Sequence, residues 1–414
     1  MYGIGAIGTG VLALLFLLVT ILGNGVSAFQ QTFITLDVTL PAERLDRAGN
    51  RDPAEMAKTT TFGYNPLLDA AMLAKIETYG IDTPLPGGAL RALLSDGAAS
   101  RVRTAVLANP DLLDQTVTFT FLAAADVDGY MKGRVTMESV QRDRRFGPEH
   151  LAVAQALVAE GTIEKRFNLS FITGADASDN RPEQAGIGVA MIGSFFMMLV
   201  VLFLSLPIGV AASIYLEEFA PKNRLTDLIE VNISNLAAVP SIVFGILGLS
   251  IFIQVAHLPQ SAPLVGGLVL TLMTLPTIII STRASLKAVP PSIRQAALGL
   301  GASKMQSVFH HVLPLAAPGI LTGTIIGLAQ ALGETAPLLL IGMVGYIATN
   351  YPDGVASGLL DPNSGMPAQI YEWAKRADPA FYERAWGGIM ILLAFMLTMN
   401  ILAIILRRRF ERRW

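Results

Sequence analysis

The stretch QAALGLGASKMQSVFHHVLP, residues 295–314, lies between two long apolar segments but is itself too polar and too rich in glycine to cross a bilayer. The helical pattern of SIRQAALGL ends at Gly299 and Gly301, where the chain can turn without a Cβ penalty. Ser303 followed three residues later by Gln306 is a capping-box pattern, which satisfies the free amide groups of a new helix. The stretch therefore predicts an elbow of two helices outside the membrane.

The second helix of this elbow is expected to be amphipathic and to end at Pro314. Its apolar residues recur at helical spacing and would form one face. They are Met305, Val308, Phe309, Val312 and Leu313. Such a face needs a partner, and the pattern alone leaves open whether the partner is another protein or the membrane surface.

The composition of the chain is that of a membrane protein. Of its 414 residues 52% are hydrophobic and only 15% are charged, whereas about 25% are charged in soluble domains. The absence of cysteine excludes disulfides, thiolate metal sites and cysteine nucleophiles. A formal net charge of −2 gives no reason to expect nucleic acid as a partner.

Six apolar segments are long enough to span a bilayer, which predicts an all-α polytopic protein with six transmembrane helices. The segments are 4–26, 187–214, 231–256, 263–282, 315–343 and 386–406. The first could instead be a cleaved signal peptide, although MYGIGAIGTG lacks the positive charges that such peptides carry.

The basic residues between and after these segments predict the orientation. They are Lys222, Arg224, Arg283, Lys287, Arg294, Lys304 and those of the tail RRRFERRW. The positive-inside rule places them in the cytoplasm. With six spans both termini are then cytoplasmic, and residues 27–185 and 344–385 lie on the outer side.

The domain organisation predicted from these patterns has three parts. They are a first transmembrane helix (1–26), an insertion domain (27–185) and a core (186–414) that contains five spans and the elbow loop 284–314. The insertion alternates like a strand in TVTFTFLAAADVD and has helical spacing in AEMAKTT and EHLAVAQALVAEG, so an α+β fold is expected. The insertion contains one histidine, His150, and a single histidine argues against a metal site or a histidine-based hydrolase in this domain.

A stripe of small and polar residues is predicted on the fifth span. Its members are spaced four, four, three and four residues apart: Gly319, Gly323, Gly327, Gln330 and Glu334. Glycines at this spacing allow close helix packing in a membrane. Gln330 and Glu334 are therefore candidates for a translocation path, the alternative being a structural hydrogen bond between spans. A path for an anion would also need a cation, for which Arg283 is the candidate in this chain.

The elbow resembles the EAA loop of ABC-importer permeases, a motif with two alanines, a glycine four residues after the second and a closing Leu-Pro. Its positions fall on Gln295, Ala296, Ala297, Gly301, Leu313 and Pro314. The resemblance implies a coupling helix that sits in a cleft of an ATP-binding subunit. Two residues depart from the motif: Gln295 replaces the usual glutamate, and His311 replaces the preferred isoleucine. Because glutamine is uncharged, a neutral hydrogen bond is expected at position 295 where the family makes a charge-assisted one.

Three further stretches narrow the resemblance. IYLEEFAPKNR, NLAAVPSIVFGILGLSIF and QALGETAPLLLIG resemble PstA-type permease subunits of the phosphate-specific importer, over about residues 187–410. The resemblance implies the type I ABC importer permease fold, with an α+β periplasmic insertion between spans 1 and 2. It also implies a location in the bacterial inner membrane. Such permeases usually carry arginine where this chain has Gln330.

The function implied by this resemblance is transport of inorganic phosphate by alternating access, with molybdate or sulfate as alternative oxyanions. The expected partners are a second permease subunit, a dimer of ATP-binding subunits, a periplasmic phosphate-binding protein and membrane lipid. No GxxxxGK[ST] pattern occurs, so ATP and Mg are expected on the partner ATPase, and no catalytic residue, metal or cofactor in this chain. A membrane sensor with an outer ligand domain is the alternative from another class.

Overall fold

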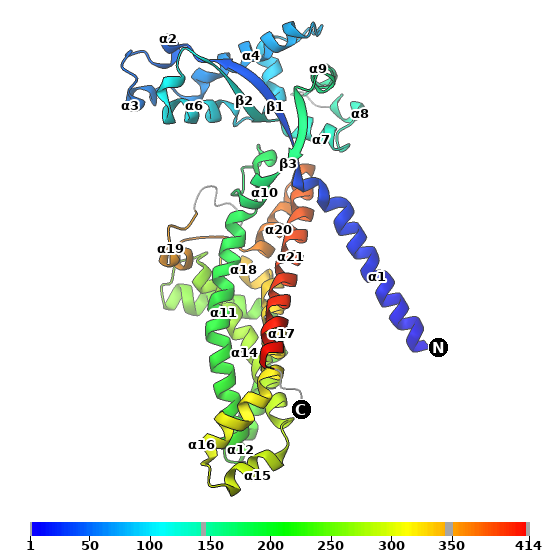
Figure 1. Cartoon of the computed structure of the whole chain (residues 1–414), viewed down its shortest axis with the longest axis vertical. Helices are drawn as coiled ribbons and strands as arrows, with labels where there is room; N and C mark the ends of the chain where they lie inside the picture. The colour runs from blue at the N-terminus through cyan, green and yellow to red at the C-terminus, as the bar shows by residue number, and fades with distance from the viewer. Residues whose placement is uncertain (1, 142–145, 344–350, 411–414) are drawn as a thin grey trace. The chain divides into compact units, whose positions relative to one another are not determined.

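The computed structural model describes residues 2–141, 146–343 and 351–410. Parts of the predicted outer loop (344–350) and of the basic tail (411–414) lie outside the described residues. Contacts divide the chain into two compact units (Figure 1). The insertion unit comprises Met1–Gly186 and Arg376–Gly387, and the bundle unit comprises Ile187–Lys375 and Gly388–Trp414.

A three-stranded antiparallel sheet forms the centre of the insertion unit. Its strands are β1 (Gln30–Thr39), β2 (Thr116–Leu122) and β3 (Ile163–Phe167), in the order β2-β1-β3. Ile34 of β1 lies opposite Phe121 on one side and Ile163 on the other. Ile34, Leu36 and Val38 are fully buried, as a period of two residues requires for a strand with one face on a core. The strand predicted in TVTFTFL is confirmed as β2.

Helices share a hydrophobic core with this sheet. They are α2 (Ala42–Leu45), α3 (Pro53–Met56), α4 (Asn65–Thr78), α5 (Gly87–Leu90), α6 (Ala98–Ala108), α7 (Ala125–Met131), α8 (Met137–Val140) and α9 (Pro148–Ala159). The short helix α10 (Leu169–Thr173) follows β3 in the chain. Leu68 of α4, Val102 of α6 and Leu157 of α9 are buried with the side chains of β1. The predicted α+β character of the insertion is confirmed. The helix α1 (Tyr2–Gly25) precedes the sheet in the chain.

The bundle unit is helical. Its elements are α11 (Gly188–Ile214), α12 (Arg224–Ala237), α13 (Ser241–Gly248), α14 (Pro263–Lys287), α15 (Pro291–Gly299), α16 (Lys304–Ser307), α17 (Leu313–Gly333), α18 (Ala336–Leu340), α19 (Val355–Leu360), α20 (Met366–Lys375) and most of α21 (Pro379–Phe410). Three π-turns continue these helices: η6 (Tyr215–Phe219), η7 (Leu249–Val255) and η8 (Val308–Val312).

Five helices of the described chain are long and apolar enough to cross a membrane. They are Tyr2–Phe29, Gly188–Phe219, Pro263–Lys287, Lys304–Gly333 and Pro379–Ile405. The predicted span 231–256 lies in two helices, Arg224–Ala237 and Ser241–Val255, that are bent by 100° relative to each other. Pro240 stands at the bend, and a proline has no N–H with which to continue a helix. The number of spans is six if this bent pair counts as one span.

The predicted fifth span, 315–343, is wrong at its end. The helix α17 stops at Gly333, and the backbone of Glu334 is extended, with φ −77° and ψ 126°. Pro337 explains the stop, because a proline ring clashes with the carbonyl four residues earlier, here that of Gly333.

Contacts between the helices fix their directions. Gly267 lies against Val200 and Gly209 against Ile278, so α11 and α14 run parallel. The segment from α12 to η7 therefore returns the chain from one end of the bundle to the other. The helix α17 runs antiparallel to α14, and residues 284–314 lie at what we call the elbow end.

Candidate functional site: the elbow and the helix ends that hold it

The elbow contains the turn and the cap that its sequence indicates. Gly301 follows α15 with φ +86°, a conformation that only glycine adopts without strain. The backbone N–H of Ser303 donates to Oε1 of Gln306 at 2.8 Å, and the backbone N–H of Gln306 donates to Oγ of Ser303 at 3.2 Å. This reciprocal pair starts the second helix, α16, directly after the turn.

Pro314 does not end the second helix, contrary to the prediction. The chain is helical from Lys304 to Gly333, because η8 joins α16 to α17. In η8 the N–H of Leu313 bonds to the carbonyl of Val308, five residues earlier. This wider turn changes the hydrogen-bond register directly before Pro314, the residue that has no N–H to donate.

The predicted apolar face of the second helix is divided in the structure. Val308 and Val312 are buried against Ile214 and Leu286 of the bundle unit. Met305 and Phe309, in contrast, are 56% and 46% exposed. One half of the face thus fixes the elbow to its own bundle, and the other half is exposed in the single chain.

The residues at the motif positions differ in their exposure. Gln295, Ala296 and Pro314 are exposed, Leu313 is half-buried and Ala297 is buried. No other atom lies within 4 Å of a Cβ placed on Gly301. Leu300, which directly precedes Gly301 in the chain, is 90% exposed. The elbow therefore presents a bare backbone turn flanked by apolar side chains.

An ion pair fastens the elbow to the end of α11. Nε and Nη2 of Arg294 donate to Oε1 of Glu218 at 3.0 and 2.8 Å. The same guanidinium donates to the carbonyl oxygens of Val289 and Leu286 at 2.7 and 2.8 Å. The Glu218 side chain is only 8% exposed. Arg294 therefore connects the first elbow helix, the end of α14 and the end of α11.

A second group of charges lies beside this pair and includes Arg283. Its guanidinium lies 2.6 Å from Oε1 of Glu230 and 3.5 Å from Oε2 of Glu217, and Lys287 lies 3.5 Å from the same Oε2. Nζ of Lys304 lies 5.1 Å from the centre of the Phe219 ring. The stretch LEEF in η6 thus contacts the end of α14 through Glu217, and the elbow through Glu218 and the Phe219 ring.

Sequence reasoning missed Glu217 and Glu218 as functional candidates. The signal was present in IYLEEFAPKNR, where two adjacent carboxylates follow directly on a predicted span. Carboxylates at such a position need cationic partners if they are buried. The arginines that pair with them lie 66 and 76 residues later, so only the fold identifies which basic residues they meet.

The candidates for a translocation path are not brought together. Gly323 lies against Ser281 and Gly327 against Thr274 in the antiparallel pair α14 and α17. From the contact of Gly323 with Ser281, Glu334 lies eleven residues away in one direction along the helix pair, and Arg283 lies two residues away in the other direction. At 1.5 Å per residue, Glu334 and Arg283 are therefore about 20 Å apart along the helix axis.

The predicted stripe is therefore only partly realised. Gly319, Gly323 and Gly327 lie against α14, and a Cβ on Gly319 or Gly323 would overlap the hydroxyl of a serine there. Gln330 is exposed in the single chain, and Glu334 stands outside the helix. Among the described residues no group of three His, Cys, Asp or Glu side chains could hold a metal ion.

Comparison with known proteins identifies the family. A family model described as "Binding-protein-dependent transport system inner membrane component" matches residues 205–414, which is half of the chain. The chain belongs to this family. It is a multi-pass membrane protein of the ABC importer permease type. A second model, "Domain of unknown function (DUF3333)", matches residues 1–141.

Curated relatives match the same half of the chain. "Phosphate transport system permease protein PstA 1" of Mycobacterium tuberculosis is 31% identical over 55% of this chain and 72% of its own length. PstA of Yersinia pestis is 31% identical over 54% of this chain and 73% of its own length. PstA of Haemophilus influenzae is 30% identical over 53% of this chain and 74% of its own length. The predicted resemblance to PstA-type permeases is confirmed.

Proposed function

We propose that this protein is the transmembrane permease subunit of an ATP-driven importer of inorganic phosphate. The observation that carries the proposal is the exposed elbow, present in a chain whose relatives are named as phosphate transport permeases. Its partners are a second permease subunit, a dimer of ATP-binding subunits that carry ATP and Mg, and a periplasmic phosphate-binding protein. Both termini are cytoplasmic.

The elbow couples this permease to the ATPase. Leu300, Met305 and Phe309 are exposed and apolar, so they supply the contact area, and the bare turn at Gly301 lets a partner approach the backbone. Gln295 supplies a neutral hydrogen bond at the edge of this surface.

Movement of the elbow reaches the spans through two fixed connections. One is the ion pair of Arg294 with Glu218 at the end of α11. The other is the continuous helix from Lys304 to Gly333, in which η8 links the elbow directly to α17. The spans then open alternately to the two sides of the membrane, and phosphate crosses between this subunit and its sister.

The residues of this chain that meet phosphate lie on the surface facing the sister subunit. Gln330 is exposed on α17 and offers amide N–H groups to an oxyanion. Arg283 is held by two glutamates at the elbow end, so the cation that attracts phosphate in the middle of the path comes from the sister subunit.

The test is uptake of radiolabelled phosphate into vesicles that contain the whole complex. The expected result is ATP-dependent uptake that excess unlabelled phosphate abolishes and that sulfate or molybdate leaves unchanged. Uptake suppressed equally by molybdate or sulfate would assign another oxyanion. Absence of ATP-dependent uptake of all three would contradict transport of this class.

A further inference from the structure

Two adjacent charged residues near the start of α21 are buried inside the insertion unit. Glu383 is 5% exposed and Arg384 is 2% exposed. Removing such charges from water costs several kcal/mol for each ion unless geometry and hydrogen bonding are nearly complete. Their partners therefore show what holds the start of this helix.

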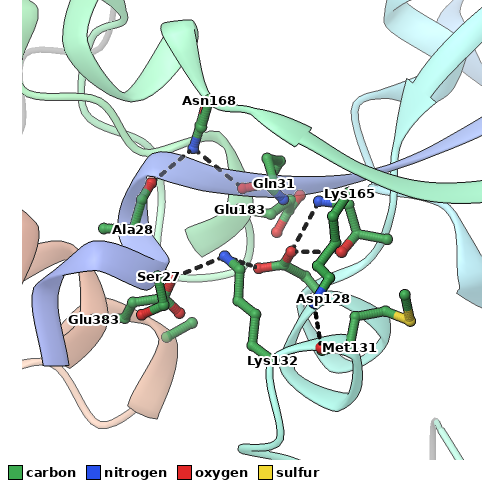
Figure 2. Close-up of polar contacts among 12 residues, drawn as sticks. Ser27, Ala28, Gln31, Asp128, Met131, Lys132, Lys165, Asn168, Glu183 and Glu383 are labelled. Carbon is green, nitrogen blue, oxygen red and sulfur yellow. Dashed lines mark hydrogen bonds and ion pairs between the residues drawn. The ribbon is translucent and has the colours of Figure 1, made fainter. Parts of the chain in front are cut away.

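Glu383 is held by two cations of the insertion domain. Its Oε1 lies 2.8 Å from Nζ of Lys132, and its Oε2 lies 2.6 Å from Nη2 of Arg134. Lys132 also lies 2.7 Å from Oδ2 of Asp128, and Figure 2 marks this ion pair with a dashed line. The second oxygen of Asp128 accepts from the backbone N–H and hydroxyl of Thr32 on β1, at 2.9 and 2.8 Å.

Arg384 connects the points where the chain enters and leaves the insertion domain. On the entering side it donates to the carbonyl of Ala28 at 3.1 Å and to Oε1 of Gln31 at 2.6 Å. On the leaving side it donates to the carbonyls of Pro182 and Glu183 at 3.4 and 3.2 Å. Asn168 reinforces the entering side, because its amide donates to the same two acceptors, Ala28 O and Gln31 Oε1 (Figure 2).

Ion pairs and hydrogen bonds hold the charged groups of this junction. The carboxylates of Asp128 and Glu383 face the cations Lys132 and Arg134, whereas the Arg384 guanidinium is held by backbone carbonyls and by the side chain of Gln31. Separating the members of such a network would leave buried charges without their partners, which is strongly unfavourable. The insertion domain and the start of α21 must consequently move as one body.

We propose that this junction is the functional role of the insertion domain: the domain grips the start of the last span through Glu383 and Arg384 and so controls the position of α21 during transport. The helix α21 continues without a break from Pro379 to Phe410, so displacement of the domain is passed along its length. The inference has two halves. The mechanical half, that the domain holds the start of α21, does not depend on the proposed function. The transport half, that this controls the position of α21 during transport, rests on the proposed function.

The experiment uses the complete complex and the natural absence of cysteine in this chain. Spin labels are attached at Glu77→Cys on α4 and Tyr382→Cys on α21, two exposed positions of the insertion unit. Arg384→Gln is expected to broaden the distance distribution between the labels. The Arg384→Gln complex is expected to assemble, but phosphate-loaded binding protein should stimulate its ATPase activity much less than that of the wild type.

A second variant and a control make the result decisive. The double variant Lys132→Gln and Glu383→Gln removes both members of a pair, which harms folding less than removing one, and should give the same two effects. Arg91→Gln breaks an ion pair with Asp69, 2.9 Å away within the insertion domain, and should leave both readouts unchanged.

Either of two results would overturn the inference. Unchanged distance distributions in both junction variants would show that the junction does not hold α21. Broadened distance distributions together with normal ATPase stimulation and normal phosphate uptake would show that the contact between the domain and α21 has no role in transport. A wild-type complex without phosphate-dependent stimulation would refute the proposed function and the transport half together, while the distances would still decide the mechanical half.

Discussion

Arg294 donates two hydrogen bonds to a single oxygen of Glu218, at 3.0 and 2.8 Å, across 76 residues of sequence. The pair closes the elbow onto the π-turn that ends α11. Because Glu218 is nearly buried and Arg294 is 22% exposed, solvent screens this pair less than a surface ion pair. This ion pair is therefore one of the contacts that fix the position of the elbow.

Arg294→Gln is expected to destabilise the solubilised protein by about 2–4 kcal/mol, because it leaves the carboxylate of Glu218 partly buried without its cation. It should also reduce uptake per ATP hydrolysed, since the elbow would move without α11. The measurement is uptake and ATPase activity on the same vesicles. Arg224→Gln, an exposed arginine at the start of α12, is the control and should change neither. An unchanged ratio of uptake to hydrolysis in Arg294→Gln would contradict the role of this pair.

Gly301→Ala is expected to cost about 1–2 kcal/mol, because an L-residue at φ +86° is strained. Gly299→Ala is the matched control: it also places a methyl group in open space on the elbow, but at a helical position. There it should be neutral or slightly stabilising. Thermal unfolding and stimulated ATPase activity of both variants separate the two cases. Equal losses would mean that a partner excludes any side chain on this surface, and that strain is not the cause.

Gly323→Val should force α14 and α17 apart, because a Cβ on Gly323 overlaps the Oγ and Cβ of Ser281. Overpacking of this kind typically costs about 1–3 kcal/mol. Membrane insertion should be normal, since valine is apolar, whereas the unfolding temperature in detergent should fall. Gly333→Ala, at the end of the same helix with open space around it, should not lower it. A normal unfolding temperature for Gly323→Val would show that the two helices do not pack as closely as this contact requires.

Glu183 should make the stability of the insertion unit depend on pH. Burial raises its pKa to about 7, while the hydrogen bond from Ser95 lowers it; the charges of Asp96 and Arg384 act in opposite directions. The folded state then binds more protons than the unfolded state between the ordinary pKa of 4.5 and about 7. Stability should fall as pH rises through this window, by about 3 kcal/mol at 1.36 kcal/mol per pKa unit.

Glu183→Gln should remove this part of the pH dependence, because glutamine accepts the same hydrogen bond and does not ionise. The measurement is the unfolding temperature of wild type and variant at pH 5 and pH 8. The wild type should lose more between the two values than the variant. Parallel losses would mean that Glu183 ionises in the folded protein as it does in water.

The sequence by itself determined the class of the protein and, within the elbow, the turn at Gly301 and the Ser303–Gln306 cap. Long apolar runs have no alternative to helices in a bilayer, and the Ser303–Gln306 cap depends only on residues three apart. The alternation of β2 in the insertion was similarly local, because side chains on a strand point to opposite faces in turn. Family resemblance required only these short motifs and the apolar pattern around them.

Only the tertiary structure decided where helices break and which charges meet. Pro314 sits within a continuous helix because η8 changes the hydrogen-bond register before it, whereas Pro240 and Pro337 accompany breaks. The partners of Glu218 and Arg384 lie 76 to 356 residues away along the chain. Periodicity describes what one element presents to its surroundings, but a buried charge is stabilised by groups that the fold brings from distant segments. For that reason the turn and the cap of the elbow could be predicted from the sequence, whereas the ionic junctions that hold the elbow and the insertion domain could not.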